Sequence, residues 1–248
     1  QRKPQNGIAC LEKSISFFDQ TEHNIQSIAA YNNLGINLML LGEWGKAENV
    51  IRKALALAYE VNHVHVAGIL DSLGELKLLR FEFEEAEELL KEGIRFAEER
   101  KKEWYAIQAM RNLARLYLHQ GKFPEAQQKA DETIRLCKKI NEKQVANMAR
   151  LVLAESLVEQ NQSDESEKIL LEIEETDPTH DFFVLGNIQR IRALIAMKNF
   201  DDEIALHHLN RSLTIFETAD DVYHTALINF YIGKCIGEND PKQATKHL

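Results

Sequence analysis

Residues 34–58 read LGINLMLLGEWGKAENVIRKALALA, and this stretch decides the fold. Apolar residues with helical spacing run up to the turn Gly42-Glu43-Trp44-Gly45. A second stripe then places apolar residues at positions 47, 50, 51, 54, 55 and 58. Residues three and four apart share one face of a helix, so each stripe indicates an amphipathic helix. The stretch is therefore predicted to form a helical hairpin.

The same pattern recurs about every forty residues along the chain. One small residue returns in each predicted first helix at intervals of 39 or 40 residues: Gly35, Gly74, Ala114, Ala154, Ala193 and Gly233. A second small residue returns with the same period in each predicted second helix: Ala47, Ala86, Ala126, Ser166, Ala205 and Ala244. A fixed period of this length is typical of a solenoid, in which each unit buries its apolar faces against its neighbours.

Glycine within these helices needs a physical reason. It costs about 1 kcal/mol relative to alanine in a helix interior, yet it occupies the repeat position at Gly35, Gly74 and Gly233. Forcing extra atoms into a packed contact costs on the order of 1–3 kcal/mol. The glycines therefore predict that a neighbouring helix approaches closely at this position.

The expected architecture is a single all-α domain over residues 1–248. Five full units are expected at about 23–62, 63–102, 103–142, 143–181 and 182–221, with a half unit at 1–22 and a partial unit at 222–248. A solenoid needs polar caps over its terminal apolar faces, and neither end of the sequence has an evident one. The chain is therefore expected to be a fragment of a longer protein.

The amino-acid composition limits which partners the chain can bind and in which cellular compartment it is expected. There are 30 Lys and Arg against 39 Asp and Glu, a formal net charge of −9, which disfavours binding to nucleic acid or anionic lipid. The apolar run 34–41 is too short to cross a bilayer. Cys10, Cys137 and Cys235 are odd in number and far apart, which favours a reducing compartment. We expect a cytoplasmic chain that binds neither membrane nor nucleic acid directly.

The sequence contains no motif of an enzyme, a cofactor site or a metal site. A phosphate-binding glycine loop, a nucleophile elbow and paired Cys-x-x-Cys motifs are all absent. The histidine pairs His63/His65 and His207/His208 are spaced so that neither presents two imidazoles on one helical face. We expect no catalysis, no cofactor and no metal.

The order of residues in each unit resembles the tetratricopeptide repeat (TPR). The first unit has Leu34-Gly35, Gly42, Trp44, Ala47, Ile51 and Ala54-Leu55, and the third has Leu113-Ala114, Tyr117, Gly121, Phe123, Ala126 and Ile134. The turn aromatics Trp44 and Phe123 favour this family over HEAT and armadillo repeats, whose lengths begin near forty residues. The resemblance implies a right-handed α-solenoid of stacked antiparallel helix hairpins. Its unit is longer than the common 34 residues, as in the sensor regions of bacterial regulators.

The resemblance also implies that the first helix of each unit lines a concave groove. The residues it places there are Asn32, Asn33, Asp71, Glu75, Gln108, Arg111, Asn112, Arg115, Glu155 and Arg190. An amide can bond the C=O and the N–H of a peptide together, so Asn33 and Asn112 are candidates for holding a bound chain. Arg111 and Arg115, one helical turn apart, are suited to a carboxylate. Alternatively, they pair with acidic residues of neighbouring units.

Two functions of different class follow. The first is a non-catalytic module that binds a protein or peptide segment in the groove, as the sensor or interaction region of a larger signalling or transcriptional regulator. The second is a structural oligomerisation scaffold or adaptor, in which uncapped ends make contacts between copies of the chain. A groove binder is expected to stay monomeric, and a scaffold is not.

Overall fold

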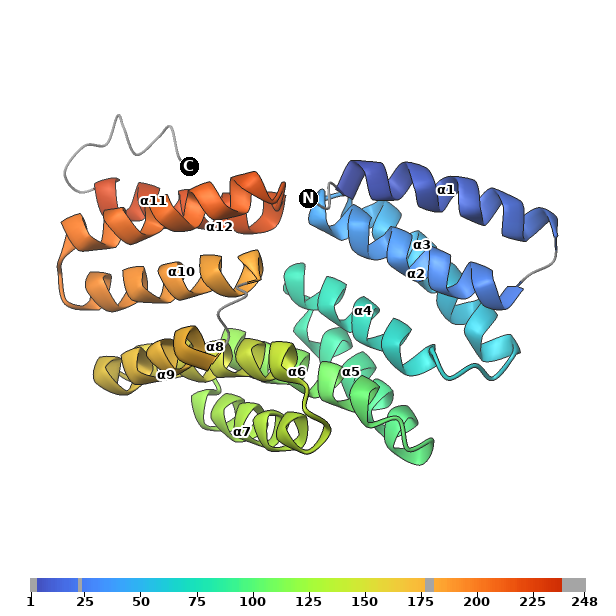
Figure 1. Ribbon diagram of the computed structural model, residues 1–248, viewed down its shortest axis with the longest axis horizontal. Helices are drawn as coiled ribbons and strands as arrows, with labels where there is room; N and C mark the ends of the chain where they lie inside the picture. Colours follow the sequence, from blue (N-terminus) through green and yellow to red (C-terminus); the bar gives the residue numbers. More distant parts are fainter. Residues whose placement is uncertain (1–3, 22–23, 177–180, 238–248) are drawn as a thin grey trace.

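The computed structural model describes residues 4–21, 24–176 and 181–237, and these form twelve helices (Figure 1). The helices are α1 (Pro4–Gln20), α2 (Asn24–Leu40), α3 (Trp44–Glu60), α4 (Val66–Leu79), α5 (Phe83–Glu99), α6 (Glu103–His119), α7 (Phe123–Ile140), α8 (Lys143–Glu159), α9 (Ser163–Thr176), α10 (Phe182–Lys198), α11 (Asp202–Thr218) and α12 (Val222–Gly237). No strand occurs within these described ranges, and the expected all-α class is confirmed. The repeat position Ala244 lies outside them.

Consecutive helices pack as antiparallel hairpins that stack into a solenoid, as expected (Figure 1). The first helices of the hairpins (α2, α4, α6, α8 and α10) also follow one another, and each contacts the next. They form the inner layer, while α3, α5, α7, α9 and α11 lie outside them. In the described part of the chain, no helix is both long and apolar enough to span a membrane.

In the first unit, the extra length lies in the helices. Both α2 and α3 contain 17 residues, so the two helices alone fill the 34 residues of a standard unit. Each hairpin turn contains one residue with a positive φ angle, in the left-handed region of backbone conformation. These residues recur with the period of the repeat: Gly42, Phe81, Gly121, Asn161 and Phe200. In the first turn, the Glu43 N–H donates to the Leu38 carbonyl at 2.9 Å. This bond ends α2 and reverses the chain.

The small residues of the repeat lie where the two helices of one hairpin touch. A Cβ on Gly74 would lie 2.7 Å from Cγ of Leu90, which is fully buried, and a Cβ on Gly35 would collide with Ile51. The close approach predicted from the glycines is present at both positions. The partner is the second helix of the same hairpin.

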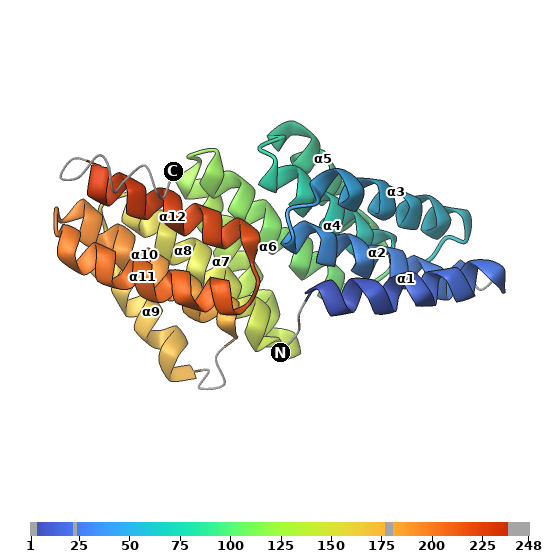
Figure 2. The same cartoon turned by 90° about the horizontal axis from the view of Figure 1, so that it is seen from above.

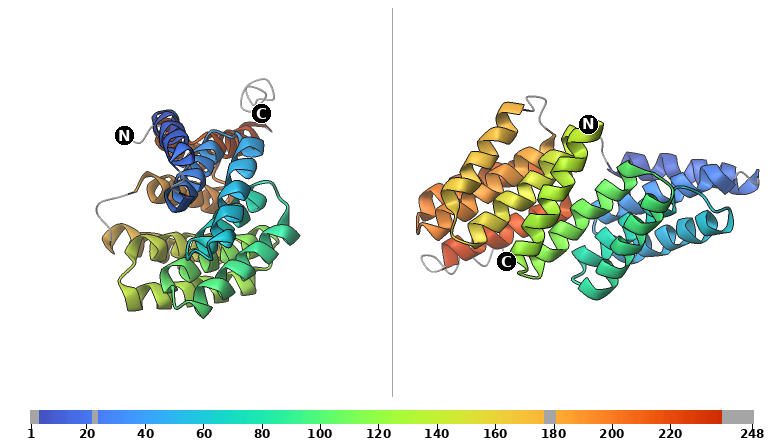
Figure 3. Two further views of the ribbon diagram at one scale, coloured as in Figure 1. Left: turned by 90° about the vertical axis from the view of Figure 1, so that its right-hand side faces the viewer. Right: turned by 90° about the horizontal axis from the view of Figure 1, so that it is seen from below.

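The solenoid curves until its last described helix reaches its first hairpin. Figure 1 shows α10–α12 beside α1–α3, with α4–α9 below both, and Figure 2 shows the same neighbours from above. A Cβ on Gly42 would lie 3.8 Å from Val222 at the start of α12. Tyr223 packs against the core formed by α1–α4. In the end-on view of Figure 3 (left), the blue and the orange-to-red helices lie above the green ones.

Filling the contact at Gly74 tests this packing. Gly74→Leu is expected to lower the free energy of unfolding by about 3 kcal/mol, because even its Cβ would lie 2.7 Å from the fully buried Leu90. Gly45→Leu is the matched control, because a Cβ at Gly45 meets nothing within 4 Å. Urea titration followed by circular dichroism measures both. Equal stability of the two variants would contradict the close-packing account.

Candidate functional site

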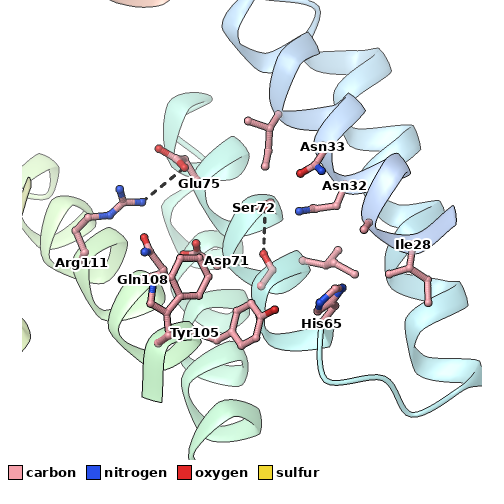
Figure 4. Close-up of a pocket in the computed structure, with 15 residues that line it drawn as sticks. Ile28, Asn32, Asn33, His65, Asp71, Ser72, Glu75, Tyr105, Gln108 and Arg111 are labelled. Carbon is pink, nitrogen blue, oxygen red and sulfur yellow. Dashed lines mark hydrogen bonds and ion pairs between the residues drawn. The ribbon is translucent and has the colours of Figure 1, made fainter. Parts of the chain in front are cut away.

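Two pockets open on the inner surface, and Arg111 lines both. The first, the α2 pocket, has a volume of about 420 Å³ and lies between α2, α4 and α6 (Figure 4). The second, the α12 pocket, has a volume of about 250 Å³ and lies between α6, α8, α10 and α12. Nine of the ten predicted groove residues line a pocket: Asn32, Asn33, Asp71, Glu75, Gln108 and Arg111 in the first, and Arg111, Arg115, Glu155 and Arg190 in the second.

The two asparagines of α2 present their amides at the edge of the α2 pocket. Asn33 is exposed, and Figure 4 shows the Asn32 amide directed toward α4. Oδ1 of Asn32 is buried and has no hydrogen-bond partner within the described ranges. An unpaired buried acceptor costs about 1–3 kcal/mol, so this amide is suited to a group that enters the pocket.

Asn112 shares the repeat position of Asn33 but has a different environment. It is fully buried beneath the surface, and Nδ2 donates to Oδ1 of Asp71 at 2.8 Å. Its own Oδ1 accepts one bond from Arg111 and one from Arg115, both at 3.0 Å. Both ends of this amide are engaged within the protein. Asn112 therefore joins α4 to α6 and does not face either pocket.

Ion pairs across neighbouring units hold two of the predicted arginines. Nη1 of Arg115 lies 2.5 Å from Glu75. Arg190 donates two hydrogen bonds to the carboxylate of Glu155, at 2.7 and 2.5 Å. Burial alone would raise the pKa of each glutamate, but the arginines outweigh burial and lower it. These pairs form the neutralising arrangement that the sequence left open as the alternative to ligand binding.

Asp71 is the exception among the inner carboxylates. Burial raises its pKa to about 6, and the positive charge of Arg111 offsets only part of this rise. Its hydrogen bond from Asn112 also favours the charged form. Asp71 therefore carries a carboxylate that gains a proton only slightly below neutral pH.

Sequence reasoning missed an aromatic wall of the α2 pocket. Tyr105 and half-exposed Trp104 begin α6, and a Cβ on Gly68 would lie 2.8 Å from the Tyr105 ring. The missing side chain at Gly68 thus makes room for this ring. His65 and Tyr105 each stand nine residues before the small residue of their helix, as does His224. This position lies before the first residue of the 34-residue TPR pattern. A comparison restricted to that pattern overlooks it, although a ring-bearing residue occupies it in three units of this chain.

The wall that α12 contributes was also missed. Tyr223 and Tyr231 line the α12 pocket together with Met148 and Phe183. They belong to the partial unit, and only the curvature of the solenoid brings them over α6 and α8. Within the described ranges, no three His, Cys, Asp or Glu side chains are grouped to hold a metal ion.

The hairpins, the period and the lined inner surface define a TPR solenoid. The sequence matches the MalT-like TPR region over residues 12–224, and the chain belongs to this family. No curated protein sequence matches it.

Solved structures share the fold at low sequence identity. NprR in complex with its cognate peptide NprX has a TM-score of 0.74 at 14% identity, covering 98% of this chain and 71% of that one. The Rap conjugation regulator of plasmid pLS20, in complex with the Phr* peptide, has a TM-score of 0.72 at 13% identity, covering 98% and 67%. BtubC from P. vanneervenii has a TM-score of 0.64 at 16% identity, covering 89% and 93%.

The two equivalent asparagines are expected to respond differently to truncation. Asn112→Ala should lower the free energy of unfolding by about 1–3 kcal/mol, because it removes the buried hydrogen bonds that Asp71, Arg111 and Arg115 make to this amide. Exposed Asn33→Ala should stay within about 0.5 kcal/mol of the parent. Urea titration compares them, and an unaffected Asn112→Ala protein would show that the buried bonds are not structural.

Asp71 is expected to make stability depend on pH. Its pKa is higher in the folded chain, about 6, than the 3.8 of an unperturbed aspartate, so the folded state binds the extra proton between these values. The contribution of Asp71 to stability is therefore present below pH 4 and lost as pH rises through 6. Asp71→Asn should gain about 1–3 kcal/mol over the parent at pH 7.5 and little at pH 4. Denaturation at both values measures this, and an equal gain at both would contradict it.

Proposed function

We propose that this chain is a non-catalytic sensor module that binds an extended peptide or protein segment along its inner surface. In the full protein it is the interaction region of a larger signalling or transcriptional regulator. The single observation that carries the proposal is the α2 pocket, where an exposed amide, an unpaired amide oxygen and an aromatic wall converge. Membership of the MalT-like TPR family supports it, as does the likeness to NprR and Rap structures that contain peptides.

The α2 pocket supplies the two kinds of contact that an extended peptide needs. The Asn32 and Asn33 amides offer donors and acceptors that match the N–H and C=O groups of a backbone, whatever its side chains. Tyr105 and Ile36 offer apolar surface for a side chain. The volume of about 420 Å³ lies within the range of roughly 300–1,000 Å³ common for ligand sites.

We place the module in the cytoplasm and assign it no chemical step. Cys137 and Cys235 are buried as free thiols, which suits a reducing compartment. Burial raises the pKa of both thiols, so they are poor nucleophiles. The acidic net charge of −9 opposes direct binding to nucleic acid or anionic membrane.

Self-association is the second candidate, and exposed aromatic residues favour it. The first and last described helices each carry an exposed phenylalanine, Phe17 on α1 at 60% and Phe230 on α12 at 52%. A scaffold would bury these faces between copies. Sedimentation velocity over a hundredfold concentration range separates the two functions, because a groove binder stays monomeric throughout.

Peptide selection tests the proposed function directly. A random pool of soluble nine-residue peptides is passed over the immobilised chain, and retained peptides are identified by mass spectrometry. Asn33→Ala should weaken each retained peptide about five- to tenfold by calorimetry, because each lost hydrogen bond contributes about 0.5–1.5 kcal/mol. Asn49→Ala, an exposed asparagine on the outer helix α3, is the matched control. An empty selection, or equal affinity of both variants, would refute groove binding.

A further inference from the structure

Arg111 stands in the wall between the two pockets with part of its guanidinium unsatisfied. Only 9% of the residue is exposed, and Nε has no hydrogen-bond partner within the described part of the chain. Nη1 faces the thioether sulfur of Met148 at 2.9 Å, and such a sulfur is a weak acceptor. Nη2 donates to Asn112, a neutral amide. No carboxylate of the described residues is hydrogen-bonded to this cation, although Asp71 and Glu75 are its charged neighbours.

The other two arginines of the α12 pocket are matched by carboxylates. Arg115 has Glu75 at 2.5 Å, and Arg190 has both oxygens of Glu155. Glu75 also lies 3.8 Å from Nη2 of Arg111, well beyond its contact with Arg115. Arg115 and Arg190 are thus hydrogen-bonded to carboxylates, whereas Asp71 reaches Arg111 only through the bridging amide of Asn112. What Arg111 lacks is a directly bonded partner, not a counter-charge.

A ligand oxygen at Arg111 would satisfy the free Nε donor. An unsatisfied buried donor costs about 1–3 kcal/mol. A carboxylate offers two oxygens in the geometry of the guanidinium fork, and such charge-assisted bonds are about twice as strong as neutral ones. A carboxylate is therefore the group that matches the free donor best.

The other residues that line the α12 pocket indicate what kind of chemical group carries the carboxylate. The wall is formed mainly by large aromatic and aliphatic side chains, contributed by α8, α10 and α12: Met148, Leu151, Phe183, Tyr223, Leu227 and Tyr231. The volume of about 250 Å³ exceeds the roughly 150 Å³ of a cavity that holds benzene. An apolar side chain or aromatic ring therefore fits beside the anionic group.

We infer that the α12 pocket binds a carboxylate that carries an apolar body, with Arg111 as its charged partner. Two sources supply this chemistry: the free C-terminus of a peptide with an apolar last residue, and a small aromatic acid. In the first form the inference rests on the proposed function, because it names the end of the bound peptide that reaches α12.

The experiment uses the full chain and separates the two sources. Random nine-residue peptides are offered in two pools, one with a free C-terminal carboxylate and one with a C-terminal amide. Benzoate, phenylacetate and indole-3-acetate form the second arm, each beside its amide. We expect the free acids to bind about tenfold or more tighter than the matching amides, in at least one arm.

Three variants assign the preference to the pocket. Arg111→Gln should abolish the difference between acid and amide, while Arg95→Gln removes the same charge from an exposed outer position and should leave it unchanged. Leu227→Trp fills the apolar part without touching the charged network. It should weaken the acids about tenfold or more even if the Arg111 variant fails to fold.

The outcomes distinguish this inference from the proposed function. Peptides that bind equally as acid and amide, together with aromatic acids that do not bind, would overturn the inference and leave groove binding standing. Aromatic acids that bind through Arg111 beside two empty peptide pools would support the inference and refute peptide binding. Failure of both arms would overturn both. An acid preference that survives in both Arg111→Gln and Leu227→Trp would also overturn the inference.

Discussion

The close contact between the two helices of each hairpin is the constraint on which the rest of the structure depends. Gly74 lies against Leu90 and Gly35 against Ile51, and neither contact has space for a Cβ. Alanine takes the same position at residues 114, 154 and 193, where it is fully buried. Because the contact recurs every 39 or 40 residues, successive hairpins adopt one geometry and their first helices form a continuous inner layer.

Polar side chains of the inner layer have two tasks. Some join neighbouring units: Arg115 binds Glu75 across α4 and α6, and Arg190 binds Glu155 across α8 and α10. Others keep unpaired polar atoms, namely the amides of α2 and Nε of Arg111. Breaking a buried ion pair is costly because it leaves one charge buried without a partner, so the paired side chains are suited to fix the curvature of the solenoid. Ligand recognition is then left to the side chains with unpaired polar atoms.

Periodicity was sufficient to predict the helices, their pairing and the inward face, because these depend on local spacing and on one repeated contact. It could not predict which inward residues stay free. Asn33 and Asn112 share a repeat position, yet α2 and α4 diverge to leave a pocket, whereas α6 is packed between α4 and α8. The curvature accumulated over five hairpins brings Tyr223 to the groove. Neighbour geometry of this kind has no signature in a single unit.

Hydrogen exchange measured by mass spectrometry tests the central claim most directly, namely that the inner layer alone forms the recognition surface. The chain is compared with and without a saturating ligand obtained by selection. Protection is expected in α2, α4, α6, α8, α10 and α12, whose side chains line the two pockets, and not in the outer helices α3, α5, α7, α9 and α11. Protection confined to the outer helices would contradict the account.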